Sequence, residues 1–181
     1  MKLTIERLGH LGDGVGHGED GGAIFAPRTL PGELVEGEVT GDRIEAPAIL
    51  TPSTDRRRAP CRHYAACGGC SLMHATDDFV AVWKVDIVRA ALAGQGQPAP
   101  IAGLDTSPER SRRRAVFSAR RTKKGAIAGF HGRASDTLVD VTACELVRPE
   151  LLSALPLLRE IAILGSSRKG ELSGAVTLTE D

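Results

Sequence analysis

Residues 61–74 read CRHYAACGGCSLMH and hold three of the chain's four cysteines, Cys61, Cys67 and Cys70, in a C-x5-C-x2-C pattern. The fourth, Cys144, follows Cys70 by seventy-four positions. Thiolates select zinc or iron–sulfur clusters, and three local cysteines with one remote cysteine suit a cubane cluster, in which each iron takes one thiolate. The pattern therefore predicts a four-thiolate site that ties the middle of the chain to its later part.

Other interpretations of these cysteines stay open at this point. Structural zinc is the main alternative, and His63 or His74 would complete a Cys/His zinc site. Two disulfides would suit an exported protein, but residues 1–6 lack the apolar core of a signal peptide. Radical S-adenosylmethionine enzymes carry C-x3-C-x2-C, whereas five residues separate Cys61 from Cys67. The spacing favours a saturated [4Fe–4S] cluster over zinc.

The composition predicts a soluble, cytoplasmic protein of one or two domains, with 181 residues and 25% charged side chains. We expect no membrane contact, because the chain has no run of eighteen apolar residues. The formal net charge of zero conceals an asymmetry, since residues 1–55 carry a net charge of −6 and residues 56–181 a net charge of +6. A basic second part indicates a polyanion partner.

Residues 1–54 predict a small OB-like β-barrel. Short apolar runs at 3–8, 23–26, 34–39 and 48–50 are typical of strands, and glycine-rich turns separate them. The glycines of Gly16–Gly21 fit a dinucleotide fingerprint, but a strand rather than a helix follows them, so we interpret them as hairpin glycines with positive φ.

Residues 55–181 predict an α+β domain built on an antiparallel sheet. Thr76 caps an expected helix at 77–93, with Trp83 on its core-facing stripe. Strands are expected at 115–119, 126–131, 138–141 and 175–179, and a helical stretch at 150–164 that Pro156 kinks or restarts. Arginines near strand ends suit RNA phosphates. The candidate RNA-binding residues are Arg56, Arg57, Arg58, Arg112, Arg113, Arg114, Arg120, Arg121, Lys123 and Lys124.

Taken together, the chain resembles the front half of an iron–sulfur RNA (uracil-5-)-methyltransferase acting on 23S ribosomal RNA. Residues 1–54 resemble the TRAM domain, an OB-like RNA-binding barrel, and residues 55–181 the iron–sulfur central domain. The other features that carry the resemblance are the Cys61–His74 block, Trp83-Lys84, Arg112–Ala115, Gly129–His131, the strand at 138–141 and Cys144. The resemblance implies that Cys61, Cys67, Cys70 and Cys144 bind a [4Fe–4S] cluster and that the partner is RNA, with 23S rRNA expected.

The resemblance also implies what this chain lacks. In the family a cysteine attacks carbon 6 of a flipped uracil, carbon 5 takes the methyl group of S-adenosylmethionine, and a carboxylate removes the proton. Those residues belong to a later Rossmann-like domain, so we expect no catalytic residue here, S-adenosylmethionine only with that domain, and an inactive isolated chain. We also expect the helix at 77–93 to be partly exposed or to mediate self-association.

Two functions of other classes compete with this interpretation. One is a stand-alone RNA-binding module with a structural zinc site made of the four cysteines. The other is a protein–protein adaptor whose basic strand is merely solvated. Metal content separates the first from the cluster, and the salt dependence of RNA binding separates the second.

Overall fold

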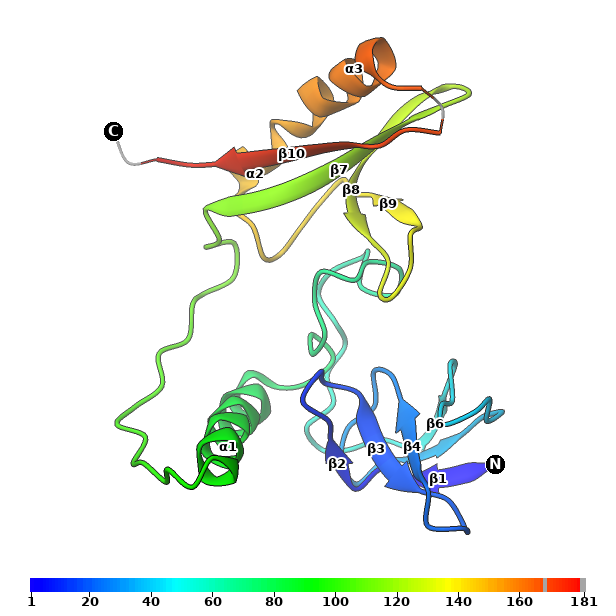
Figure 1. Cartoon of the computed structure of the whole chain (residues 1–181), viewed down its shortest axis with the longest axis vertical. Coiled ribbons are helices and arrows are strands. Elements are labelled where there is room, and N and C mark those ends of the chain that lie inside the picture. The colour runs from blue at the N-terminus through cyan, green and yellow to red at the C-terminus, as the bar shows by residue number, and fades with distance from the viewer. Residues whose placement is uncertain (168, 180–181) are drawn as a thin grey trace. The chain divides into compact units, whose positions relative to one another are not determined.

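The computed structural model describes residues 1–167 and 169–179 and divides the chain into two compact units (Figure 1). Unit 1 consists of Met1–Ala59 with Ser71–Thr106, and unit 2 consists of Pro60–Cys70 with Ser107–Asp181. The predicted boundary between a TRAM-like domain and an iron–sulfur domain at residues 54 and 55 stays a prediction. The two compact units have other bounds than the two predicted domains. Ser71–Thr106 packs with unit 1, and the cysteine-bearing segment packs with unit 2. No helix among the described residues is long and apolar enough to cross a membrane.

Unit 1 contains two small antiparallel sheets. One has the order β1-β5-β6, formed by Lys2–Thr4, Leu34–Glu36 and Ala48–Thr51, and pairs Leu3 with Val35. The other has the order β2-β3-β4, formed by Arg7–Leu8, Gly14–His17 and Ala23–Ala26, and pairs Val15 with Phe25. Alternate residues face a shared core of Leu3, Ile5, Ile24, Ala26, Val35 and Ile44.

The glycines of the first hairpin do two different jobs. Gly12 and Gly21 have φ of 83° and 78°, the left-handed region that glycine enters without a steric penalty. The prediction of positive φ is wrong for Gly16, which lies inside β3 and is not among the residues with positive φ. A Cβ on Gly16 would lie 2.9 Å from Leu3 Cδ1 and closer still to the Thr4 carbonyl. Gly16 is therefore required by close packing between the two sheets.

Helix α1 spans Asp77–Gly94 and begins as its sequence predicts. The Thr76 hydroxyl accepts a hydrogen bond from Phe79 N–H at 3.4 Å, and Asp77 and Asp78 lie at the positive end of the helix dipole. The helix nevertheless has no fully buried residue. Trp83 is only half-buried. The expectation that it lies in a core is therefore wrong, because the apolar stripe that carries it is only partly covered.

Unit 2 is an antiparallel sheet of order β10-β7-β8-β9 with helices on one face (Figure 1). Its strands are β7 Arg114–Thr122, β8 Gly125–His131, β9 Leu138–Asp140 and β10 Leu172–Thr177. The expected helical stretch forms two helices, α2, Pro149–Leu152, and α3, Leu155–Gly165. Pro156 restarts the helix, because it occupies the first turn of α3. The core joins α3 to alternate residues of β7 and β8 and comprises Ala115, Phe117, Ala119, Ala128, Val147, Leu151, Leu155, Leu158 and Ala162.

Candidate metal centre and nucleic-acid interface

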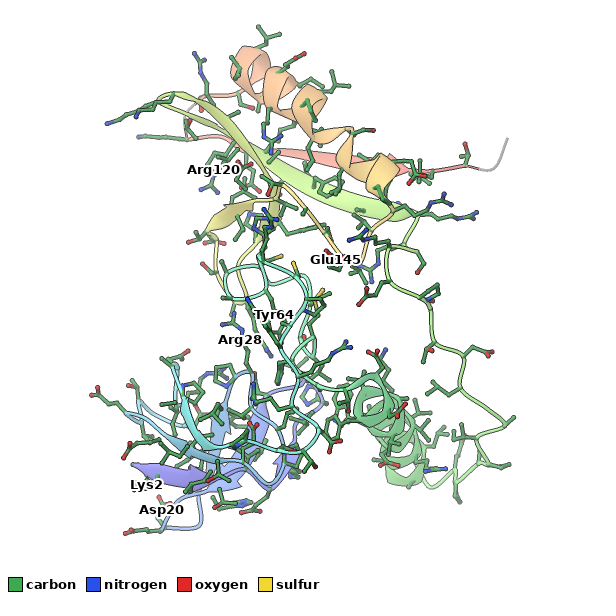
Figure 2. All side chains as sticks on the ribbon, turned by 180° about the vertical axis from the view of Figure 1, so that it is seen from behind. Lys2, Asp20, Arg28, Tyr64, Arg120 and Glu145 are labelled. Carbon is green, nitrogen blue, oxygen red and sulfur yellow. The ribbon has the colours of Figure 1, made fainter. Side chains whose placement is uncertain are left out.

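The cysteine-bearing segment of unit 2 is a series of tight turns. Tyr64 N–H donates to the Cys61 carbonyl at 3.1 Å, and Cys67 N–H donates to the His63 carbonyl at 2.8 Å. The Tyr64 ring is buried beneath these turns, and sulfur atoms gather in the loops around Tyr64 and Glu145 (Figure 2). The turns bring Cys61 and Cys67 onto one short loop, which the spacing of the cysteines alone does not determine.

Gly68 fastens this loop to the sheet. Its N–H donates to the His131 carbonyl at 2.9 Å. A Cβ on Gly68 would lie 2.8 Å from the backbone nitrogen of Arg133, a contact that real Cβ atoms do not make. Only glycine allows this approach, so Gly68 serves packing against the end of β8.

Cys144 reaches the same region from the loop after β9. Thr142 N–H donates to His63 Nε2 at 3.2 Å, and the Thr142 hydroxyl lies 3.1 Å from the same nitrogen. His63 therefore connects the first cysteine loop to the loop of Cys144. Its Nε2 is engaged with the protein backbone, which argues against His63 as a zinc ligand.

The four thiols are half-buried and act on one another electrostatically. Burial, together with the nearby Cys144, Cys67 and Cys61, raises the pKa of Cys70 to about 11 against the opposing effect of Arg112. Burial likewise raises the pKa of Cys67. Gly69 N–H donates to Cys67 Sγ and Leu146 N–H donates to Cys144 Sγ, both at 3.4 Å. These are the hydrogen bonds that thiolates bound to metal receive from backbone amides.

The part of the chain that the structure describes holds no ready-made site for a single metal ion, and the two candidate metal groups require different spacings of the thiols. Across residues 1–167 and 169–179, no three Cys, His, Asp or Glu side chains are close enough to bind one metal ion. Four thiolates on one zinc would lie about 3.8 Å apart, from the Zn–S bond length and tetrahedral angles. A cubane cluster spreads its four thiolates over a larger volume, because each binds a different iron.

The candidate RNA-binding residues divide between the two units. In unit 2, Arg112, Arg113, Arg114, Arg121, Lys123 and Lys124 are exposed along β7 and its ends. Arg112 is also tied to the loop of Cys144, since its N–H donates to the Leu146 carbonyl at 3.1 Å and its carbonyl accepts from Arg148 N–H at 3.0 Å. The basic strand and the thiol cluster are thus parts of one structure within unit 2.

Arg120, on the open face of the same sheet, is engaged by a carboxylate that the sequence did not single out. Its guanidinium lies 2.7 Å from Glu171, which also contacts His131 at 3.1 Å (Arg120 is labelled in Figure 2). Burial acts to raise the pKa of Glu171, but hydrogen bonds from Ser118, Arg120 and His131 outweigh it and lower the pKa. Glu171 follows a loop in the sequence, and only the pairing of β10 with β7 brings it here.

The basic run of unit 1 is largely engaged inside the protein. Arg56 binds the fully buried carboxylate of Glu33 with Nε and Nη2 and donates to the Arg28 carbonyl at 2.8 Å. Arg57 forms a bidentate pair with Asp77 at 2.8 and 3.1 Å. Arg58 is exposed. Most of the exposed candidate cations therefore lie in unit 2, with Arg58 as the exception in unit 1.

His74, the alternative zinc ligand, is a buried residue of unit 1. Burial, together with the nearby Arg56 guanidinium, lowers its pKa to about 4. Its carbonyl accepts from Arg57 N–H at 2.8 Å, and the neighbouring Thr76 N–H donates to the Asp55 carbonyl at 2.8 Å. His74 is thus part of the packing that joins residues 55–57 to 74–76.

Comparisons with known proteins give relatives but no matching family model. A protein of Brucella melitensis described as an uncharacterized RNA methyltransferase is 39% identical over 179 residues, which are 99% of this chain and 43% of that protein. A 23S rRNA (uracil(1939)-C(5))-methyltransferase of Halomonas elongata is 36% identical over 98% of this chain and 40% of its own length. The relatives are RNA methyltransferases by name. The chain spans about two fifths of their length.

A solved structure shares the fold. It is the tRNA (uracil-54, C5)-methyltransferase of Pyrococcus abyssi in complex with S-adenosyl-L-homocysteine, which superposes with a TM-score of 0.58 and 21% sequence identity over 91% of this chain and 37% of that one. The expected sheet-rich, mainly antiparallel architecture with few helices is confirmed, and it is similar to part of a uracil-5-methyltransferase.

Proposed function

We propose that this chain is the RNA-binding and iron–sulfur portion of an S-adenosylmethionine-dependent methyltransferase that makes 5-methyluridine, with 23S rRNA as its substrate. The observation that supports the proposal most is the alignment of 98–99% of the chain with relatives named as RNA methyltransferases, one of them a 23S rRNA uracil-5-methyltransferase. In the proposal, residues 1–54 act as a TRAM-type barrel and residues 55–181 as the central domain.

Cys61, Cys67, Cys70 and Cys144 are proposed to hold a [4Fe–4S] cluster. When bound, the cluster supplies a rigid covalent connection between the first cysteine loop and the loop of Cys144, and it is saturated by four thiolates. The protein itself supplies the N–H donors of Gly69 and Leu146, and the loop contact through Gly68. Because all four cysteines serve the cluster, no thiolate of this chain is left as a methyl-transfer nucleophile.

The RNA contacts are proposed to lie on the exposed cations of unit 2, chiefly Arg112–Arg114, Arg121 and Lys123-Lys124. Arg112 contacts the backbone of the loop that carries Cys144, so a formed cluster would fix the position of this arginine. The cluster then positions RNA, and methyl transfer needs a domain with its own cofactor site. We expect the isolated 181-residue chain to bind RNA without methylating it.

Metal analysis of the purified chain tests the cluster. Anaerobic reconstitution should give about four irons and four sulfides per chain and broad visible absorption. A colourless protein with one zinc per chain would contradict the cluster and support the alternative function, an RNA-binding module with a structural zinc site.

RNA binding tests the interface. Reversing Arg112 and Arg114 to Glu should weaken binding of a 23S rRNA fragment about tenfold or more, and should make the log–log salt slope shallower by about 1.4 for two lost single-strand phosphate contacts. Arg89→Glu, at an exposed position of unit 1 outside the candidate residues, is the control and should leave the slope unchanged. Equal slopes in the double variant and the unsubstituted chain would favour the adaptor.

A further inference from the structure

Unit 1 has a pocket that the proposed iron–sulfur and phosphate contacts do not use. It has a volume of about 230 Å³ and is lined by Gly9, His10, Leu11, Asp13, Phe25 and the Asp42-Arg43 pair. All of these residues belong to the first hairpin, to β4 or to the segment beside it, so the pocket is formed within one unit. It combines one aromatic ring with a guanidinium and carboxylates.

Phe25 faces this pocket because of the alternation along β4. Its neighbours Ile24 and Ala26 are buried in the core, so the ring between them lies on the opposite face and stays partly exposed. The backbone on both sides is held, since Phe25 N–H donates to the Asp42 carbonyl at 2.8 Å and its carbonyl accepts from Ile44 N–H at 2.9 Å. Gly9 lies against the ring edge, where a Cβ would be 3.9 Å from Cε1. The ring is thus a fixed, partly exposed platform.

The polar groups in the pocket wall include one guanidinium and two carboxylates, those of Arg43, Asp13 and Asp42. Arg43 Nη2 lies 3.3 Å from the Asp13 carboxylate, and Arg43 Nε lies 3.3 Å from Glu45. Asp42 adds a second carboxylate to the pocket wall. Adjacent donors and acceptors are what the edge of a nucleobase presents, and stacking on an aromatic ring is how single-stranded bases are held.

The local charge decides between a base and a phosphate. Residues 1–55 carry a net charge of −6, and two carboxylates accompany the one guanidinium in the pocket wall. A phosphate would be repelled there, whereas a neutral base would not. A planar heterocycle also uses the ring face, which a phosphate cannot.

We propose that this pocket binds one unstacked nucleobase of single-stranded RNA, stacked on Phe25 with its edge bonded by Arg43 and a carboxylate. The inference rests on the proposed RNA-binding function and adds a base-binding subsite in the acidic unit. Unit 1 then contributes contacts to a base, and unit 2 contributes contacts to phosphates. The two contributions should differ in salt dependence, because only phosphate contacts release counterions.

Titration of the isotope-labelled full chain with the 5′-monophosphates of adenosine, guanosine, cytidine and uridine tests the pocket, with ribose 5-phosphate as the base-free control. At least one nucleotide should shift the amide signals of Gly9, Phe25 and Arg43, and ribose 5-phosphate should not. Equal shifts from ribose 5-phosphate, or nucleotide shifts confined to other residues, would overturn the proposal.

Substitutions separate this inference from the proposed function. Phe25→Leu should weaken nucleotide binding about tenfold, and Phe25→Trp should retain it, since stacking needs a ring. Arg43→Gln gives a second variant that leaves the ring in place and should also weaken nucleotide binding. If an RNA fragment binds the unsubstituted chain and Phe25→Leu with equal affinity, the base pocket is contradicted, while the proposed function is not. If the chain binds the nucleotides but no RNA, the proposed function is contradicted, while the base pocket is not.

Discussion

Both units join remote parts of the chain through a cluster of polar groups, and the two clusters differ in how their members are paired. In unit 1 the buried Glu33 carboxylate accepts from Leu30 N–H at 2.8 Å, Ser53 N–H at 3.1 Å and the Arg56 guanidinium. In unit 2 the four thiols are half-buried, and those of Cys67 and Cys144 accept amide hydrogen bonds from Gly69 and Leu146. The first cluster is held by an ion pair within the protein, whereas in our proposal the second is completed by a bound cluster.

The largest expected effect breaks the unit 2 cluster. Cys144→Ser should reduce iron from about four per chain to below one after reconstitution, because a cubane with three thiolates leaves one iron open to solvent and exchange. Iron analysis and visible absorption measure the loss. Ser167→Ala, on a surface loop, is the control and should retain full iron. The amide spectrum of unit 1 should not change, and an unfolded unit 1 would show that the two clusters are not independent.

The next effect breaks the unit 1 cluster. Arg56→Ala leaves the Glu33 carboxylate buried without its cation and should lower the free energy of unfolding by about 3–5 kcal/mol. Arg57→Ala is a matched control on the adjacent residue, since its partner Asp77 is 82% exposed and such pairs contribute about 1 kcal/mol or less. Urea unfolding followed by Trp83 fluorescence measures both. Similar losses in the two variants would contradict the role given to Glu33.

A third prediction concerns pH and sharpens the same contrast. The pKa of His74 is about 4 in the folded protein, because it is buried and lies near Arg56, against 6.5 for an ordinary histidine. The unfolded chain therefore binds more protons between these values, and the stability from neutral His74 is complete above pH 6.5 and lost on acidification towards pH 4. Moving from about pH 7.5 to about pH 5 should cost unit 1 about 2 kcal/mol.

Glu33 extends this loss to lower pH. Its burial acts to raise the pKa, but hydrogen bonds from Arg56, Leu30 and Ser53 lower it below 4.5. Its stabilisation is therefore present above pH 4.5 and disappears as pH falls through the lowered value. Urea midpoints between about pH 7.5 and about pH 3 record the two steps, and His74→Gln should flatten only the upper one.

The smallest expected effect concerns helix α1, whose apolar side chains include Val82 at 62% exposure. Self-association through residues 77–93 stays a prediction. Val82→Asp should weaken it about tenfold by placing a charge in an apolar contact, as measured by sedimentation over a range of concentrations. Ala91→Asp puts the same charge on the opposite side of the helix and should have little effect. If the unsubstituted chain is monomeric at all concentrations, the prediction of self-association is contradicted.

Local signals in the sequence predicted the elements that local chemistry decides. Thr76 with Asp77 and Asp78 predicted the start of α1, and Pro156 predicted a restart that the structure realises as α2 and α3. The expected strand at 3–8 is instead two strands, because the chain changes partner there: Ile5 N–H donates to the Glu33 carbonyl and Glu6 N–H to the Val15 carbonyl, both at 2.9 Å. The contact with Glu33 joins residues far apart in the chain, which no periodicity records.

The candidate site shows the same division. The cysteine spacing singled out four residues that all lie in unit 2, and the other three act on the pKa of Cys70. That they hold a cluster stays a prediction. The internal engagement of Arg56 was not predicted, because a run of three arginines looks alike whether it meets solvent or a buried carboxylate. Glu171 was missed for a related reason, since β10 must pair with β7 before it meets Arg120.

The discontinuity of unit 2 has a consequence in time. Residues 60–70 belong to it, yet Ser71–Thr106 is folded into the other unit before the chain returns at Ser107. During synthesis Cys144 follows Cys70 by seventy-four residues, which at about 5–20 residues per second is about 4–15 s. For that interval the first three thiols are on the growing chain without their fourth partner, and a complete four-thiolate site exists only after the basic strand has been made. If the proposed cluster binds, its insertion is therefore a late step, after the basic strand has been made.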